Sequence, residues 1–140
     1  MELLILSEMQ AIDYATKLTV PTSIVSITCP LDDKVVFKHN GKLKNVFHMQ
    51  FNDIVVKNGD FNCPQQEDFK GLKNFIDKLD CELLIVHCFA GVSRSAATAA
   101  AIAQYLGIEK EIFNSEDYDP NPLVYKLACK ELGIEPMKGV

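Results

Sequence analysis

The sequence lacks the features that proteins commonly use to bind nucleic acids. It contains a single arginine, Arg94, among 14 lysines and arginines, and it has no strongly basic segment. Its net charge is −5, whereas nucleic-acid-binding domains present basic patches that neutralise phosphates. We therefore expect no nucleic-acid partner. Because an acidic chain repels anions at long range, any phosphate site must attract its ligand through local groups.

Long apolar runs and paired cysteines are also missing. No apolar run approaches the roughly 20 residues that a membrane-spanning helix needs. The N-terminal run at 3–6 lacks a cationic start and is too short for a signal peptide. The five cysteines are an odd number without Cys-x-x-Cys spacing, which disfavours a disulfide framework or a zinc site. We expect free thiols in a reducing cytoplasm, with no membrane partner, no metal and no other cofactor.

Short apolar runs alternate with amphipathic segments, which is typical of an α/β protein. The length of 140 residues, without repeats or a linker, predicts one domain over 1–140. We expect strands at 2–6, 23–29, 45–51 and 81–87, and helices at 8–19, 65–79, 95–106 and 123–132. Two further expectations are a hairpin or strand pair between 35–37 and 45–51, and a short helix at 108–113.

This alternation predicts a mainly parallel central sheet with helices on both faces. Ligands of such open sheets bind at the carboxyl ends of the strands. The strand at 81–87 ends in the most informative segment of the chain, so the residues that follow it are the first candidates for a functional site.

That segment, residues 87–95, reads His-Cys-Phe-Ala-Gly-Val-Ser-Arg-Ser and precedes an alanine-rich helix. A strand that turns directly into a helix brings several backbone N–H groups together at the positive end of the helix dipole. An anion of phosphate size can bind there. Cys88 would lie at the floor of this turn, where the amides and the dipole favour its thiolate form. Since Cys-x5-Arg alone occurs by chance, the prediction depends on all nine positions and their flanks.

Arg94 lies six positions after Cys88 and is chemically distinct from the other cations of the chain, which are all lysines. Lysine is sufficient for surface charge and solubility. A planar guanidinium can instead donate two parallel hydrogen bonds to two oxygens of a tetrahedral oxyanion. We therefore predict that Arg94 binds the same anion that Cys88 would attack.

With these residues in place, the chain resembles the cysteine-based protein tyrosine phosphatases. It is most similar to the small dual-specificity type and its compact bacterial relatives, whose signature HCxAGxSRS matches residues 87–95 completely. The order and spacing of the expected elements are compatible with that family over most of the chain. The resemblance implies a dual-specificity-phosphatase-like fold and hydrolysis of phosphomonoesters through a phosphocysteine.

The resemblance also implies a role for each residue of the segment. Cys88 would be the nucleophile, Arg94 would bind the substrate and the transition state, and the Ser95 hydroxyl would stabilise the departing thiolate. His87 would orient the loop from behind rather than act as a base. The backbone amides that would bind the phosphate oxygens belong to Phe89, Ala90, Gly91, Val92, Ser93 and Arg94.

The family's general acid is an aspartate upstream of the signature, and two residues fit that description. Asp53 directly follows the strand expected at 45–51, which resembles the family's placement, and it is the favoured candidate. Asp60 lies further along the same loop and is the alternative. Either residue could instead be an ordinary loop aspartate in an Asx turn. Asn121 precedes Pro122 and is expected to cap the last helix, with lining of the pocket as the alternative.

The expected substrate is a phosphorylated one, either a phosphoprotein or a small aryl phosphate. Apolar Phe89 and Val92 suit an aryl ester, and the loop lacks the lysines that accompany phosphoinositide or polyphosphate specificity in the family. Phosphotyrosine is favoured, with dual specificity as a further possibility. Two alternative functions remain open: a catalytically weak phosphate-binding module, and a thiolate-based sulfurtransferase or arsenate reductase.

Overall fold

The computed structural model describes residues 1–55 and 63–140, and within them four strands form one sheet. These strands are β1 (Glu2–Ser7), β2 (Thr22–Thr28), β3 (Leu43–Gln50) and β4 (Leu83–Cys88). Their order across the sheet is β1-β4-β2-β3, and every neighbouring pair is parallel. The two central strands, β2 and β4, are buried along their whole length, as expected when both faces of a parallel sheet are covered.

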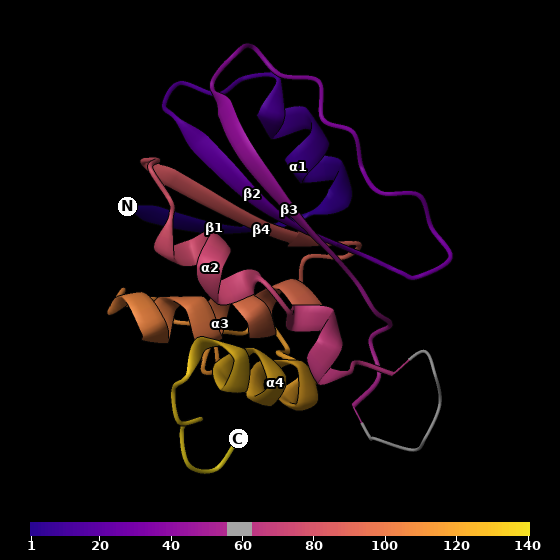
Figure 1. Cartoon of the computed structure of the whole chain (residues 1–140), viewed down its shortest axis with the longest axis vertical. Coiled ribbons are helices and arrows are strands. Elements are labelled where there is room, and N and C mark those ends of the chain that lie inside the picture. Colours follow the sequence, from indigo (N-terminus) through magenta and orange to yellow (C-terminus); the bar gives the residue numbers. More distant parts are fainter. Residues whose placement is uncertain (56–62) are drawn as a thin grey trace.

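Helices lie on both faces of this sheet (Figure 1). The helix α1 (Glu8–Ala15) covers one face, while α2 (Leu72–Asp77), α3 (Arg94–Leu106) and α4 (Pro122–Leu132) lie on the other. The predicted α/β class, a parallel sheet between helices, is thereby confirmed. None of the helices in the described part of the chain has both the length and the apolar character that a membrane crossing requires.

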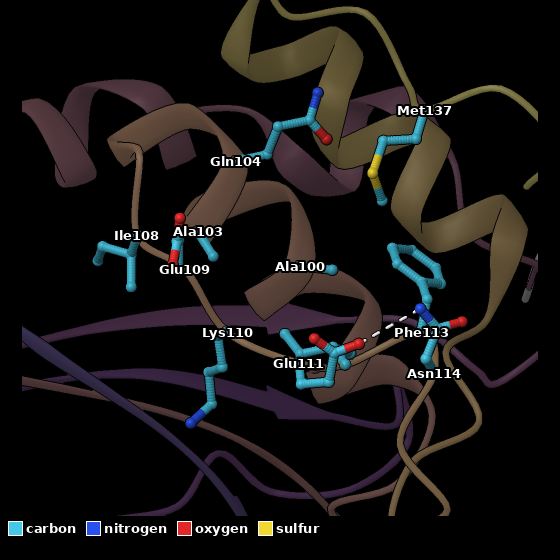
Figure 2. Close-up of a pocket in the computed structure, with 11 residues that line it drawn as sticks. Ala100, Ala103, Gln104, Ile108, Glu109, Lys110, Glu111, Phe113, Asn114 and Met137 are labelled. Atoms are coloured by element: carbon cyan, nitrogen blue, oxygen red, sulfur yellow. Dashed lines mark hydrogen bonds between the residues drawn. The ribbon is translucent and has the colours of Figure 1, made fainter.

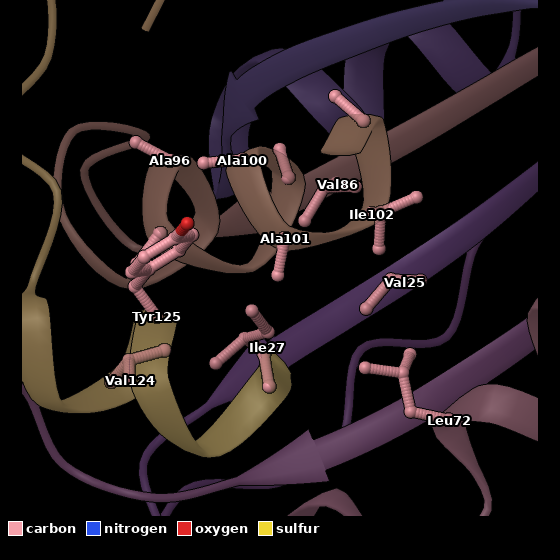
Figure 3. Close-up of a cluster of buried hydrophobic side chains, with 14 of the residues drawn as sticks. Val25, Ile27, Leu72, Val86, Ala96, Ala100, Ala101, Ile102, Val124 and Tyr125 are labelled. Atoms are coloured by element: carbon pink, nitrogen blue, oxygen red, sulfur yellow. The ribbon is translucent and has the colours of Figure 1, made fainter. Parts of the chain in front are cut away.

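The larger hydrophobic core lies between the sheet and α3 (Figure 3). Val25 of β2 and Val86 of β4 face this layer, where α3 presents a run of buried alanines. Small side chains let the helix approach the sheet closely, which a run of leucines would prevent. This close packing fixes the start of α3 relative to the carboxyl end of β4.

The first helix begins as predicted but ends earlier than predicted. Ser7 caps α1 in a reciprocal capping box: its hydroxyl accepts from the Gln10 amide at 3.1 Å, and its own amide donates to Gln10 Oε1 at 2.9 Å. The expectation of a helix to residue 19 was wrong, because Thr16 closes the helix. Its hydroxyl donates to the carbonyl oxygen of Asp13, and its backbone amide donates there too.

Three other expectations about the elements were also wrong. Residues 35–37 form neither a hairpin nor a strand, because β3 pairs in parallel with β2 and Phe37 instead packs edge-on against His87. The helix expected at 65–79 is divided into the 3₁₀ turn Gln66–Phe69 and α2 by Gly71, whose φ is +92°. Residues 108–113 are not helical; Ile112 is buried in the core while Glu109 and Glu111 remain exposed.

Candidate active site

The loop formed by residues 88–94 lies at the carboxyl edge of the sheet, between the last residue of β4 and the first residue of α3. β4 is flanked by β1 and β2, so the loop begins near the middle of the sheet rather than at its edge. This is where open parallel sheets bind ligands, and the residues singled out in the sequence are the ones placed there.

Gly91 holds loop 88–94 directly against the junction of β1 and α1. Its φ is +74°, and a Cβ at this position would lie 2.5 Å from the Ser7 backbone nitrogen and 2.6 Å from the Leu6 carbonyl carbon. The Glu8 amide donates to the Phe89 carbonyl at 3.1 Å on the same side. Only glycine satisfies both the backbone angle and the space, so this contact fixes the curvature of the loop.

Cys88 lies at the floor of this loop, and it is 2 % exposed. The Gly91 amide donates to its Sγ at 3.3 Å, and the Ser95 hydroxyl oxygen lies 3.1 Å from the same sulfur. Burial acts to raise the pKa of the thiol, but the hydrogen bonds from Ser95 and Gly91 and the charge of Arg94 outweigh it, so the pKa lies below its ordinary value. The structure thus places Cys88 where its thiolate is stabilised.

The Arg94 guanidinium is buried and held from behind by the backbone. Its Nη1 donates to the Phe51 carbonyl at 3.0 Å and lies 3.4 Å from the Cys29 sulfur. A guanidinium has five N–H donors, so these contacts orient the group while leaving donors for an anion. Neither Phe51 nor Cys29 was singled out in the sequence. The Phe51 contact uses a backbone carbonyl, which every residue has, and Cys29 is 65 residues away from Arg94 in the chain.

His87 is completely buried beneath the loop. Its Nε2 lies 2.6 Å from the Ser26 hydroxyl in β2, and its Nδ1 lies 3.2 Å from the Cys88 carbonyl. Burial lowers the pKa of His87, which favours the neutral ring, although the hydrogen bond to the Cys88 carbonyl acts in the other direction. These contacts agree with the expected orienting role. Ser26 carried no distinct signal in the sequence, because β2 has three other hydroxyl residues, Thr22, Ser23 and Thr28.

Asp53 is brought to the rim of loop 88–94. Its Oδ1 accepts hydrogen bonds from the Ser93 hydroxyl and from the Asn121 side-chain amide, both at 2.8 Å. Asn121 also caps α4, as predicted from the sequence, by accepting from the amides of Leu123 and Val124. Asp60, the alternative candidate for the general acid, lies outside the described residues.

The rim of the loop is apolar and open. The Phe89 side chain is 70 % exposed and that of Val92 is 39 % exposed, and Ala90 between them is exposed too. Exposed apolar side chains beside a polar floor suit a ligand with an aromatic or aliphatic body and a charged head.

A hollow lies at the other end of α3 (Figure 2). Its volume is about 430 Å³, and Gln104, Ile108, Phe113 and Met137 are among its lining residues. The Gln104 side chain is already bonded to the Tyr125 hydroxyl and the Glu135 carbonyl. Loop 88–94, where a backbone amide and a hydroxyl converge on one sulfur, is therefore the candidate active site.

Within the described residues, no group of three or more histidine, cysteine, aspartate or glutamate side chains is placed to hold a metal ion. No family model matches this chain, and no curated protein matches it.

Proposed function

We propose that this chain is a phosphomonoesterase of the cysteine-based tyrosine phosphatase type, acting through a phosphocysteine without a metal. The observation that supports it is the environment of Cys88: the Gly91 amide, the Ser95 hydroxyl and the Arg94 charge all favour a thiolate at the floor of an anion-sized loop. A phosphate dianion repels nucleophiles, so a site that neutralises its charge and supplies an ionised sulfur addresses both obstacles.

The first step transfers the phosphoryl group to sulfur. Cys88 Sγ attacks phosphorus, the S–P bond forms, and the P–O bond to the leaving group breaks. The Arg94 guanidinium and the loop amides take up the charge on the three equatorial oxygens. Protonated Asp53 delivers its proton to the leaving oxygen, so that an alcohol or phenol departs rather than an alkoxide.

The second step releases phosphate. Water attacks phosphorus, the Asp53 carboxylate accepts the proton of that water, and the S–P bond breaks. The Ser95 hydroxyl, 3.1 Å from Cys88 Sγ, donates to the sulfur as it becomes a thiolate again. The net reaction consumes one phosphomonoester and one water and yields an alcohol and inorganic phosphate.

The proposed substrate is an aryl phosphate, with phosphotyrosine in a protein as the favoured case and dual specificity as an extension. The exposed Phe89 and Val92 side chains offer apolar surface to an aromatic ring whose phosphate enters the loop. We place the protein in the cytoplasm, because a nucleophilic thiolate has to stay reduced.

The direct test is phosphate release from p-nitrophenyl phosphate in the presence of EDTA. We expect turnover by the wild type and none by Cys88→Ser, together with a phosphorylated wild-type enzyme after rapid acid quench. Cys81→Ser is the control: it makes the same change two residues before the start of β4 and should leave the rate unchanged. Equal rates in Cys88→Ser and the wild type would exclude the covalent mechanism, and binding of vanadate without turnover by either would favour a phosphate-binding module.

A leaving-group series identifies the general acid. Asp53→Asn should slow phenyl phosphate by about 10²–10³-fold and p-nitrophenyl phosphate much less, because a good leaving group depends less on protonation. Asp60→Asn, the same change at the alternative candidate, is measured beside it. The assignment is reversed if Asp60→Asn, rather than Asp53→Asn, shows the steeper dependence.

A further inference from the structure

The two ends of the Asn121 side chain have different partners. Its carbonyl oxygen accepts from the amides of Leu123 at 3.0 Å and Val124 at 3.1 Å, which caps α4. Its amide nitrogen donates to Asp53 Oδ1 at 2.8 Å and to the Ile54 carbonyl at 3.0 Å. Capping needs only an oxygen, and serine or aspartate would supply one equally well. The nitrogen is what asparagine adds, and both of its bonds go to the segment that carries Asp53.

The backbone before α4 is bonded to loop 88–94 as well. The Asp119 amide donates to the Val92 carbonyl at 3.0 Å, and the Asn121 amide donates to the Ser93 carbonyl at 3.3 Å. Asn121 is 1 % exposed, so its side chain has little freedom to move. It therefore holds the Asp53 segment at a fixed position relative to the loop that carries Cys88.

Both side-chain donors reach the same oxygen of Asp53. Ser93 Oγ and Asn121 Nδ2 each lie 2.8 Å from Oδ1. An oxygen that accepts two hydrogen bonds is a poor site for a proton, because a proton there would face both donors. The proton of the neutral acid therefore resides on Oδ2.

On the basis of the proposed function, we propose that Asn121 is a positioning residue for the general acid. With Ser93 it binds Oδ1 of Asp53 and so directs Oδ2, with its proton, toward the leaving oxygen of a substrate in loop 88–94. Asn121 does not touch the substrate; it acts through Asp53. The α4 cap and the placement of the acid thus depend on one side chain.

Asn121→Ser separates the two roles, because serine keeps an oxygen for the cap and removes the nitrogen. We expect phenyl phosphate hydrolysis to fall by about 10–10²-fold and p-nitrophenyl phosphate hydrolysis by less than about threefold. The melting temperature should stay close to that of the wild type. Asn121→Asp keeps the size and the cap but faces Asp53 with a carboxylate, and it should show the same pattern. Asn114→Ser, the same change at an exposed position, should alter neither rate.

A double-mutant cycle tests whether Asn121 acts through Asp53. On an Asp53→Asn background, Asn121→Ser should add less than about twofold to the loss on phenyl phosphate, because the acid is already absent. Full additivity, or equal losses on both substrates in the single variant, overturns the proposal while leaving the phosphatase function intact.

A readout without turnover keeps the proposal testable if the chain proves inactive. Exchange of the Ile54 backbone amide, which donates to the Asn52 carbonyl at 3.0 Å, should accelerate at least tenfold in Asn121→Ser and stay unchanged in Asn114→Ser when it is measured by NMR. Unchanged exchange in Asn121→Ser overturns the proposal. If exchange accelerates in Asn121→Ser but the wild type shows no Cys88-dependent hydrolysis, the proposed function is overturned and the positioning contact stands.

Discussion

The two ends of helix α3 differ in chemistry. At the start of α3, the Gly91 amide and the Ser95 hydroxyl lie 3.3 and 3.1 Å from the Cys88 sulfur. At its last turn, the hollow beside Met137 has a volume of about 430 Å³ and a mostly apolar lining. The convergence of donors on one atom, rather than the presence of a hollow, is what marks loop 88–94 as the candidate active site.

Two glycines sharpen the comparison. Gly91 lies three residues before α3 and Gly107 directly follows it, and their φ angles are nearly the same. Gly91 has φ +74° and Gly107 has φ +71°. A Cβ at Gly91 would meet backbone atoms within 3 Å, whereas a Cβ at Gly107 would have nothing within 4 Å. At the helix C-terminus the glycine serves only the left-handed turn. At the N-terminus it also lets two segments of backbone touch.

Among the variants that compare the two ends of α3, the largest effect is expected for Arg94→Lys. Lysine keeps the positive charge but cannot donate two parallel hydrogen bonds to a phosphate, nor can it bond the Phe51 carbonyl in the same way. We expect kcat for p-nitrophenyl phosphate to fall by about 10²–10³-fold with an unchanged circular dichroism spectrum. Lys110→Arg, the reverse exchange beside the hollow, is the control. A lysine variant with near-normal kcat would contradict the bidentate role.

The next largest effect is expected for the free energy of unfolding when each of the two glycines is replaced by alanine. Gly91→Ala should lower the free energy of unfolding by about 2–5 kcal/mol, because left-handed strain adds to a backbone clash. Gly107→Ala should cost only about 1–2 kcal/mol, since strain acts alone. Urea denaturation measures both values. Equal losses would mean that the Ser7 backbone can move away, and that the loop is less rigidly placed than its contacts indicate.

A smaller effect is expected for Ser95→Ala, in the pH dependence of Cys88 alkylation. The Ser95 hydroxyl stabilises the thiolate and contributes to the lowered pKa of Cys88. Its removal should raise that pKa, so the rate of reaction with iodoacetamide should reach half its maximum at a higher pH than in the wild type. Ser115→Ala, outside the loop, should leave the midpoint in place. A midpoint that stays or falls in Ser95→Ala would contradict the assigned hydrogen bond.

The parts of this structure that were predictable from sequence are local in the chain. The start of the first helix after Ser7, the end of α3 before Gly107 and the cap at Asn121 each depend on a few consecutive residues, and all were expected. The same is true of loop 88–94, whose strand, turn and helix adjoin one another. The prediction of one helix at 65–79 was wrong for a local reason. It followed the apolar periodicity and gave too little weight to Gly71, whose left-handed conformation divides the segment.

The parts that were not predictable join distant segments. The bonds from Asn121 to Asp53, from Arg94 to Phe51 and from Ser26 to His87 span 68, 43 and 61 residues, respectively. Such partners depend on which strands become neighbours, and the order β1-β4-β2-β3 is a property of the whole chain. Local patterns find the candidate site residues, whereas the tertiary fold decides which side chains orient them.

The smallest effect on turnover is expected for a substitution in the hollow, which tests whether the hollow takes part in the proposed reaction. Met137 lies over the hollow with 47 % of its surface exposed, and Met137→Ala would enlarge the opening without touching loop 88–94. We expect kcat/KM for p-nitrophenyl phosphate to stay within about twofold and stability to change by less than about 1 kcal/mol, as is usual for exposed side chains. A loss of turnover comparable to that of Arg94→Lys, at unchanged stability, would show that the hollow communicates with the loop through α3. The two ends of the helix would then have to be treated as one site.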